Sequence, residues 1–132
     1  MNIEVRGWHV QKKIMFSPEE MAADQLTLLP TGQFINVSGD STRLSQIYPI
    51  DKFIPLLFTG RRDKNDVKIF EGDLVCYRVN APYPAEVYFD KRDCGFRLRV
   101  IREMQYDKTY PMLFAQKVVG NIYENPELQE VK

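Results

Sequence analysis

The stretch FTGRRDKNDVKIFEGDLVCY, residues Phe58–Tyr77, decides how this chain folds. Asn65 and Asp66 tolerate a positive φ angle, so they suit a tight turn between two extended segments. Gly72 suits a second turn, because glycine reaches positive φ without steric cost. We therefore expect strands joined by turns here. Across the whole chain, the residues expected at turns are Gly60, Asn65, Asp66, Gly72 and Gly120.

The same stretch could be considered as a ligand site. Asp63 begins a pattern that resembles a calcium-binding loop, but Lys68 stands where the loop requires glycine. Leu74 stands where the loop requires a bidentate glutamate. Gly60 and Gly72 are isolated, and no Gly-Lys-Ser/Thr follows them, so a phosphate-binding loop is also disfavoured. We expect no metal site and no cofactor.

Composition indicates an ordinary globular protein with little electrostatic bias. The chain has 132 residues, and 18 basic residues balance 18 acidic ones. Such a balance gives no overall attraction to nucleic acid or to a membrane. No apolar run approaches the ~20 residues that cross a bilayer, so we expect a cytoplasmic protein that does not bind membranes. Cys76 and Cys94 are expected to be buried free thiols in that compartment.

Short β-rich segments separated by turn residues predict an α+β chain that is mainly β. We expect a β-rich segment with a short helix over residues 1–57, and a small barrel of the SH3 type over residues 58–132. Ser17, Pro18 and Glu20 form a capping-box pattern, which predicts a helix ending near Gln25. Pro55 is expected at a sheet edge or a strand start. The other predicted strands cover residues 3–10 and 14–16, which form a hairpin, and residues 26–37, where a turn at residues 30–32 separates two strands. Further strands are predicted over residues 73–79, 85–90, 95–101 and 114–123, and a helical turn follows Asn125.

Several of these segments resemble the YopX family of phage and prophage proteins. The resemblance rests on four stretches: VRGWHVQKKIMFSPEEM, FTGRRDKNDVKIFEGDLV, AEVYFDKRDCGFRLRV and VVGNIYENPEL. It implies an α+β chain with an SH3-type barrel in its C-terminal part, an origin in phage-derived DNA, and no established activity or catalytic residues. Residues 25–50 have no counterpart. Asp66 stands where the family usually has glycine, and His9 stands where aspartate is common.

The segment KRDCGFRLRVIR, residues Lys91–Arg102, carries five basic residues and one acidic residue. On a strand, alternate residues share a face, so Leu98 and Val100 would face the core and the arginines would face outward. Tyr83, Tyr106 and Tyr110 could offer rings for base stacking. The opposing interpretation is a sheet face on which arginines pair with acids across strands. The candidate nucleic-acid-binding residues are Lys91, Arg92, Arg97, Arg99 and Arg102.

Catalysis is not expected from the titratable residues. His9 is the only histidine, which limits histidine-based triads and metal sites. Clusters of acids are expected to be solvated turn and cap residues: Glu71 and Asp73, Asp90 and Asp93, and Glu124, Glu127 and Glu130. The sequence thus favours a non-enzymatic phage accessory protein that acts through protein–protein contacts or self-association as a homo-oligomer. The alternative is a nucleic-acid-binding module that uses residues 91–102.

Overall fold

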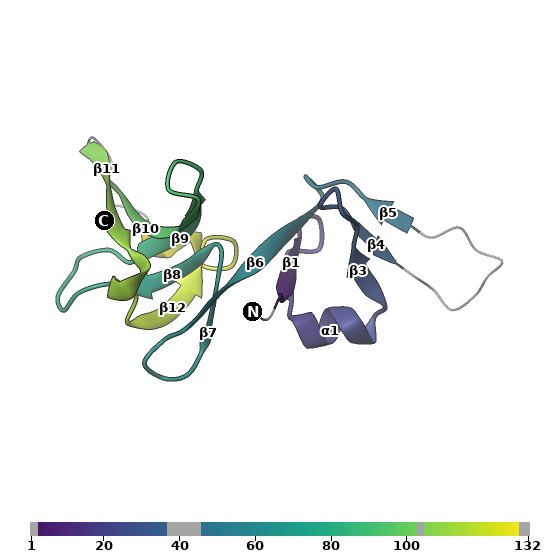
Figure 1. Cartoon of the computed structure of the whole chain (residues 1–132), viewed down its shortest axis with the longest axis horizontal. Coiled ribbons are helices and arrows are strands. Elements are labelled where there is room, and N and C mark those ends of the chain that lie inside the picture. The colour runs from purple at the N-terminus through teal and green to yellow at the C-terminus, as the bar shows by residue number, and fades with distance from the viewer. Residues whose placement is uncertain (1–2, 37–45, 103–104, 130–132) are drawn as a thin grey trace. The chain divides into compact units, whose positions relative to one another are not determined.

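The computed structural model describes residues 3–36, 46–102 and 105–129, and the side chains at positions 46, 101–102 and 105–107 lie outside that description. The chain is mainly β and divides into two compact units (Figure 1). One unit is Ile3–Leu57, and the other contains the described residues from Phe58 onward.

The N-terminal unit is built from short antiparallel strands. Strands β1 and β2 form the predicted hairpin, in which Trp8 lies opposite Met15. A second, three-stranded sheet has the order β3-β4-β5. The bounds are β1 (Val5–His9), β2 (Ile14–Phe16), β3 (Leu26–Leu28), β4 (Phe34–Asn36) and β5 (Gln46–Tyr48).

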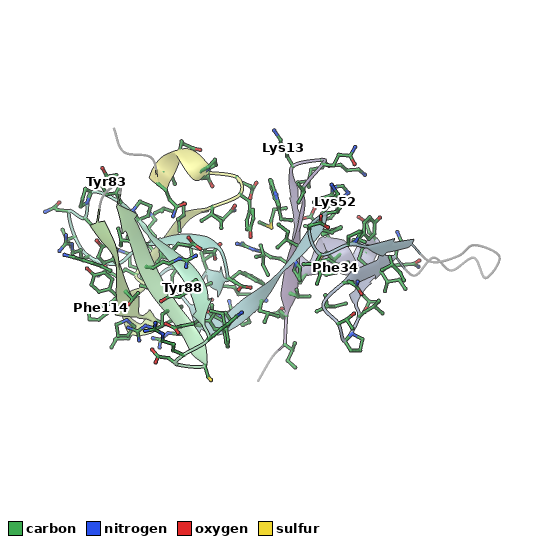
Figure 2. The ribbon with its side chains drawn as sticks, turned by 90° about the horizontal axis from the view of Figure 1, so that it is seen from above. Lys13, Phe34, Lys52, Tyr83, Tyr88 and Phe114 are labelled. Atoms are coloured by element: carbon green, nitrogen blue, oxygen red, sulfur yellow. The ribbon has the colours of Figure 1, made fainter. Side chains whose placement is uncertain are left out.

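Helix α1 (Pro18–Ala23) begins as the sequence predicts. The Ser17 hydroxyl accepts a hydrogen bond from the Glu20 N–H at 3.1 Å, and the Ser17 N–H donates to the Glu20 carboxylate at 3.2 Å. This reciprocal pair satisfies two N–H groups that a helix start leaves without partners. The helix buries Met21 against Phe34, which Figure 2 labels within this unit.

Strand β6 (Phe53–Arg62) follows, and its two halves have different partners. Its first half pairs with β1, where Pro55 lies opposite Gly7. Its second half pairs with β7 (Lys68–Phe70) from Phe58 onward. Pro55 therefore lies where β6 has one partner strand among the described residues, which suits a residue without an N–H group to donate.

The C-terminal unit contains a curled five-stranded sheet with the order β11-β10-β9-β8-β12 (Figure 1). Four of these strands were predicted, and β11 was missed because its polar sequence QYDKTYP lacks an apolar alternation. The bounds are β8 (Asp73–Cys76), β9 (Ala85–Asp90), β10 (Gly95–Arg102), β11 (Gln105–Pro111) and β12 (Lys117–Asn121). The 3-10 helices are η1 (Met112–Phe114) and η2 (Pro126–Gln129).

The core of this unit lies against one face of the sheet. Ile69, Val75, Val87 and Leu98 are fully buried there, and Val100 is nearly so. Leu98 and Val100 come from β10, as the alternation of that strand predicts. Their burial leaves the intervening arginines on the opposite face.

Of the five positions predicted at turns, Asn65, Asp66 and Gly72 lie in turns, and the other two glycines have different roles. Asp66 has φ +63° and Gly72 has φ +87°, so both take the left-handed conformation that their turns need. Gly60 has φ +87° but lies inside β6, where the register with β7 shifts, so it forms a β-bulge rather than a turn. The prediction of a turn at Gly120 is wrong.

Gly120 lies inside β12, beside a register shift between Val118 and Gly120. Its backbone passes so close to Asn125 that a Cβ atom there would lie 2.6 Å from the Asn125 side-chain oxygen. Close approach, rather than a turn, therefore requires glycine at this position.

Two further predictions are corrected. Cys94 is exposed, because it lies in the turn between β9 and β10 with φ +52°, and Cys76 is only partly buried. Both are free thiols. Asp73 is buried rather than solvated, and its carboxylate accepts a hydrogen bond from the Phe70 N–H at 2.7 Å. The Asp73 carboxylate thus stabilises the turn that contains Gly72.

The buried carboxylate of Asp63, which the sequence suggested only as the start of a calcium-like pattern, organises the first turn. One oxygen of Asp63 accepts hydrogen bonds from the N–H groups of Asn65 and Val67, at 2.8 and 2.9 Å. The other oxygen accepts from the Val118 N–H at 2.8 Å, which ties the turn to β12. Burial raises the pKa of Asp63, but these three N–H groups and the charge of Lys117 outweigh burial and hold the pKa below 3.8.

We expect Asp63→Asn to lower the free energy of unfolding by about 2 kcal/mol or more, because its amide N–H group would face the Val118 N–H and leave a partly buried donor unsatisfied. The matched control is Asp66→Gly in the same turn, which should stay within about 1 kcal/mol of wild type because glycine accepts the positive φ. Urea denaturation measures both. Equal losses in the two variants would contradict the role given to Asp63.

Candidate functional site

The predicted basic face lies on β9 and β10. Arg97 and Arg99 project from β10 on the side opposite Leu98, as expected. Tyr88 of β9 lies opposite Arg97 in the sheet, and Figure 2 labels it in this unit. The face therefore contains arginines and one aromatic ring, which is the combination that a nucleic-acid surface would need.

Most of the arginine charge is already neutralised within the sheet. Arg99 donates to the Glu86 carboxylate at 3.0 Å, directly across from it on β9. The Arg99 guanidinium also lies 4.5 Å from the centre of the Tyr88 ring, which leaves that ring stacked on a cation rather than open to a base. Glu86 is buried, so this ion pair is an integral part of the sheet.

Arg97 has an acidic partner as well. Its guanidinium lies 3.5 Å from the Asp93 carboxylate in the adjoining turn. Asp90 caps that turn by accepting hydrogen bonds from the N–H groups of Arg92 and Asp93, at 2.8 and 3.3 Å, and from the Tyr88 hydroxyl at 3.2 Å. Desolvation raises the pKa of Asp90, but these donors and the charge of Arg97 outweigh desolvation and lower the pKa below its ordinary value, so the Asp90 carboxylate stays ionised beside Arg97.

The remaining predicted members of the surface do not join the arginine face. Lys91 and Arg92 are exposed in the turn and form no ion pair with any residue that the structure describes. Tyr110 lies opposite Leu98, on the core side, and stacks on Tyr77 with ring centroids 4.9 Å apart. Tyr83 packs against the core. The side chains of Arg102 and Tyr106 lie outside the described residues.

We predict no binding of labelled single- or double-stranded oligonucleotides at ~50 mM salt, where phosphate contacts are strongest. The reason is that Glu86, Asp90 and Asp93 offset the charges of Arg97 and Arg99. Fluorescence anisotropy measures binding. Micromolar affinity that falls with salt and is lost in a folded Arg97→Glu/Arg99→Glu variant would contradict this prediction.

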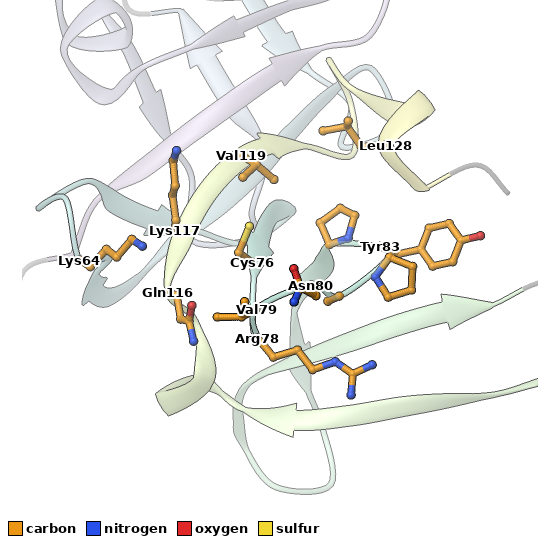
Figure 3. Close-up of a pocket in the computed structure, with 13 residues that line it drawn as sticks. Lys64, Cys76, Arg78, Val79, Asn80, Tyr83, Gln116, Lys117, Val119 and Leu128 are labelled. Carbon is orange, nitrogen blue, oxygen red and sulfur yellow. The ribbon is translucent and has the colours of Figure 1, made fainter. Parts of the chain in front are cut away.

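A second candidate site is an apolar pocket on the C-terminal unit, which sequence reasoning missed. It has a volume of about 380 Å³ and is lined by the loop between β8 and β9, by β12 and by η2. Figure 3 shows Val79 and Val119 near its centre, with Lys64 and Lys117 on one side and Leu128 on the other. Val79 is 79% exposed.

Hydrogen bonds from the first turn build one wall of this pocket. The Lys64 N–H donates to the Gln116 carbonyl at 3.0 Å, and the Gln116 N–H donates to the Cys76 carbonyl at 2.8 Å. All three residues line the pocket. Because Asp63 fixes the turn, it also fixes the position of Lys64. A signal in the sequence was present: the loop segment VNAPYP is apolar but has no strand alternation.

The single histidine, possible metal ligands and possible membrane-spanning helices were also considered. His9 is partly buried, and its Nδ1 atom accepts a hydrogen bond from the Lys12 N–H at 3.2 Å. Within residues 3–36, 46–102 and 105–129, no three His, Cys, Asp or Glu side chains gather as a metal site would require. None of the helices in those ranges has the length and apolar character that crossing a bilayer demands.

The fold and the two surfaces define a mainly β chain of two compact units, with an apolar pocket and a charge-paired strand face on the second unit. The chain belongs to the YopX family: the family profile, described as YopX protein, matches residues 4–130. The resemblance noted in the sequence is thereby confirmed. No curated protein matches the chain significantly.

A solved structure has a similar fold. It is the crystal structure of protein EF1440 from Enterococcus faecalis, which matches with a TM-score of 0.62 and 23% sequence identity. The match covers 98% of this chain and 99% of that one. At this level of identity the likeness concerns the fold alone.

Proposed function

We propose that this chain is a non-enzymatic accessory protein of phage or prophage origin that acts through protein–protein contacts, including self-association. The observation that carries the proposal is the apolar pocket with Val79 exposed at its centre. Concave apolar sites of about 300–1,000 Å³ are the usual places where proteins take up a ligand or a partner's side chain. The phage context is what the resemblance to the YopX family of phage and prophage proteins implies.

A non-catalytic role is supported by how the acids of the chain are used. Asp63, Asp73 and Asp90 each accept hydrogen bonds from backbone N–H groups and hold turns in place. A general acid or base needs a carboxylate that can reach a substrate proton. These three carboxylates stabilise turns through their hydrogen bonds, so we assign them a structural role.

We further propose that the C-terminal unit is a small barrel of the SH3 type. Strands β8 to β11 follow one another in the sheet, η1 comes after β11, and β12 returns to pair with β8. Such a return of the last strand to the first favours closure. Small barrels host many functions, so the proposal for function rests on the pocket and not on the barrel.

Exposed apolar side chains around this unit support a contact role. Leu113 is 68% exposed and Phe114 is 45% exposed, in addition to the valines of the pocket. Aromatic and apolar anchors of this kind are enriched at the centres of protein interfaces. A cytoplasmic location fits the free thiols of Cys76 and Cys94, since reducing compartments keep thiols unpaired.

The test replaces Val79 with the photo-crosslinking residue p-benzoylphenylalanine in the full chain, expressed in its native host cells. We expect protein adducts after irradiation, identified by mass spectrometry, because the position lies where the partner would bind. The matched control is the same replacement at Ile47, an apolar residue of the N-terminal unit that is 55% exposed. An adduct with a second copy of the chain would indicate self-association.

If position 79 gives no more adducts than position 47, the proposal that the pocket makes protein contacts is wrong. Each adduct is to be reproduced with the purified partner, so that chance neighbours in the cell do not count as support.

A further inference from the structure

The charges around the apolar pocket are all of one sign. Lys64, Arg78 and Lys117 line it, and none of the described residues that line it is acidic. We propose that the pocket binds an acidic segment of a partner protein, in which an apolar side chain is flanked by carboxylates. This inference rests on the proposed function and names the chemistry of the partner.

The apolar part of such a segment would meet Val79, Val119 and Leu128. All three side chains are exposed, and they come from the β8–β9 loop, from β12 and from η2. Burying an apolar side chain among them removes apolar surface from water, which contributes roughly 25 cal/mol for each Å². The pocket is thus ready to take one or two apolar side chains without rearranging its own core.

The flanking carboxylates would meet the three cations that line the pocket. Lys64, Arg78 and Lys117 are exposed, and none of them forms an ion pair with a residue that the structure describes. This differs from the basic face, where Arg97 and Arg99 have acidic partners. Lys117 also acts on Asp63, so Lys64 and Arg78 have the more available charges.

Arg78 lies near the ring of Tyr77, with its guanidinium carbon 5.6 Å from the ring centre. A cation held over a ring keeps its outer N–H groups free for a carboxylate. Glu124 and Glu127 belong to the neighbouring C-terminal segment but do not line the pocket, and Glu124 already accepts a hydrogen bond from the Asn121 side chain. The lining itself therefore stays cationic.

Two amide side chains favour a peptide as the occupant. Asn80 and Gln116 line the pocket, and their side chains form no hydrogen bond with any part of the chain that the structure describes. A primary amide both donates and accepts, so it can pair with the C=O and N–H groups of an extended peptide. A fatty acid offers no such groups along its length. We therefore assign the pocket to a peptide segment rather than to a lipid.

The test uses the full chain and a fluorescein-labelled peptide, Glu-Asp-Leu-Asp-Val-Glu-Asp, in anisotropy titrations. We expect binding at ~50 mM salt that weakens as salt rises to ~300 mM, because the contacts are partly electrostatic and exposed. Replacing the acids of the peptide with lysine, or its Leu and Val with serine, should abolish binding.

Variants of the chain test whether the acidic peptide binds in the pocket. Lys64→Glu/Arg78→Glu should weaken binding by at least about tenfold, and Val79→Asp should weaken it as well, since all three positions are exposed and their substitution spares the core. The matched control is Lys91→Glu/Arg92→Glu, which makes the same change of charge on the turn between β9 and β10. It should leave the affinity within about twofold of wild type.

Three results would overturn the inference. They are absence of binding by the acidic peptide, equal weakening by the Lys91→Glu/Arg92→Glu control, and direct binding of decanoate by a chain that does not bind the peptide, which would point to a lipid-like ligand. The proposed function can be judged separately. If the crosslinker at position 79 captures a partner segment without acidic residues, the proposal that the pocket makes protein contacts is supported, and the proposal that its partner segment is acidic is wrong.

Discussion

The carboxylate of Asp63 is the interaction on which most of the C-terminal unit depends. It is buried and accepts hydrogen bonds from three backbone N–H groups, those of Asn65, Val67 and Val118. The last of these lies 55 residues away in the sequence, so one side chain joins an early turn to a late strand. Hydrogen bonds to a charged group contribute about 1.5–3 kcal/mol each, which makes this junction one of the strongest local constraints. Because Lys64 and Gln116 are fixed by the same junction, the wall of the apolar pocket follows from it.

The contrast between the two basic surfaces shows why local charge along the chain is a poor guide to a binding site. The segment from Lys91 to Arg102 has the largest excess of basic residues in sequence, yet Glu86 pairs with its Arg99 across the sheet and Asp93 pairs with its Arg97 across the turn. The cations of the pocket come from separate segments of the chain, and no single segment reveals them. Folding brings them together around apolar side chains.

Local features were predictable from the sequence because they depend on neighbouring residues. The capping box at Ser17 and the positive φ of Asp66 follow from the residue types alone. Long-range features were not. Gly120 is required by the approach of Asn125, and Asp63 is buried because β12 supplies a donor from far along the chain. Of the candidate site, the arginine face was predictable as a strand pattern, whereas its pairing and the pocket depend on tertiary contacts.

The most direct test is a carboxyl-carbon NMR titration of Asp63, followed together with the backbone amides of Lys64, Gln116 and Val118. Since the folded pKa of Asp63 lies below 3.8, the stabilisation is fully present above about pH 4 and is lost as pH falls through the folded pKa. We predict that Asp63 titrates below 3.8 and that all three amides shift with the same midpoint. An Asp63 pKa at or above 3.8, or amides that do not respond to its protonation, would contradict the account.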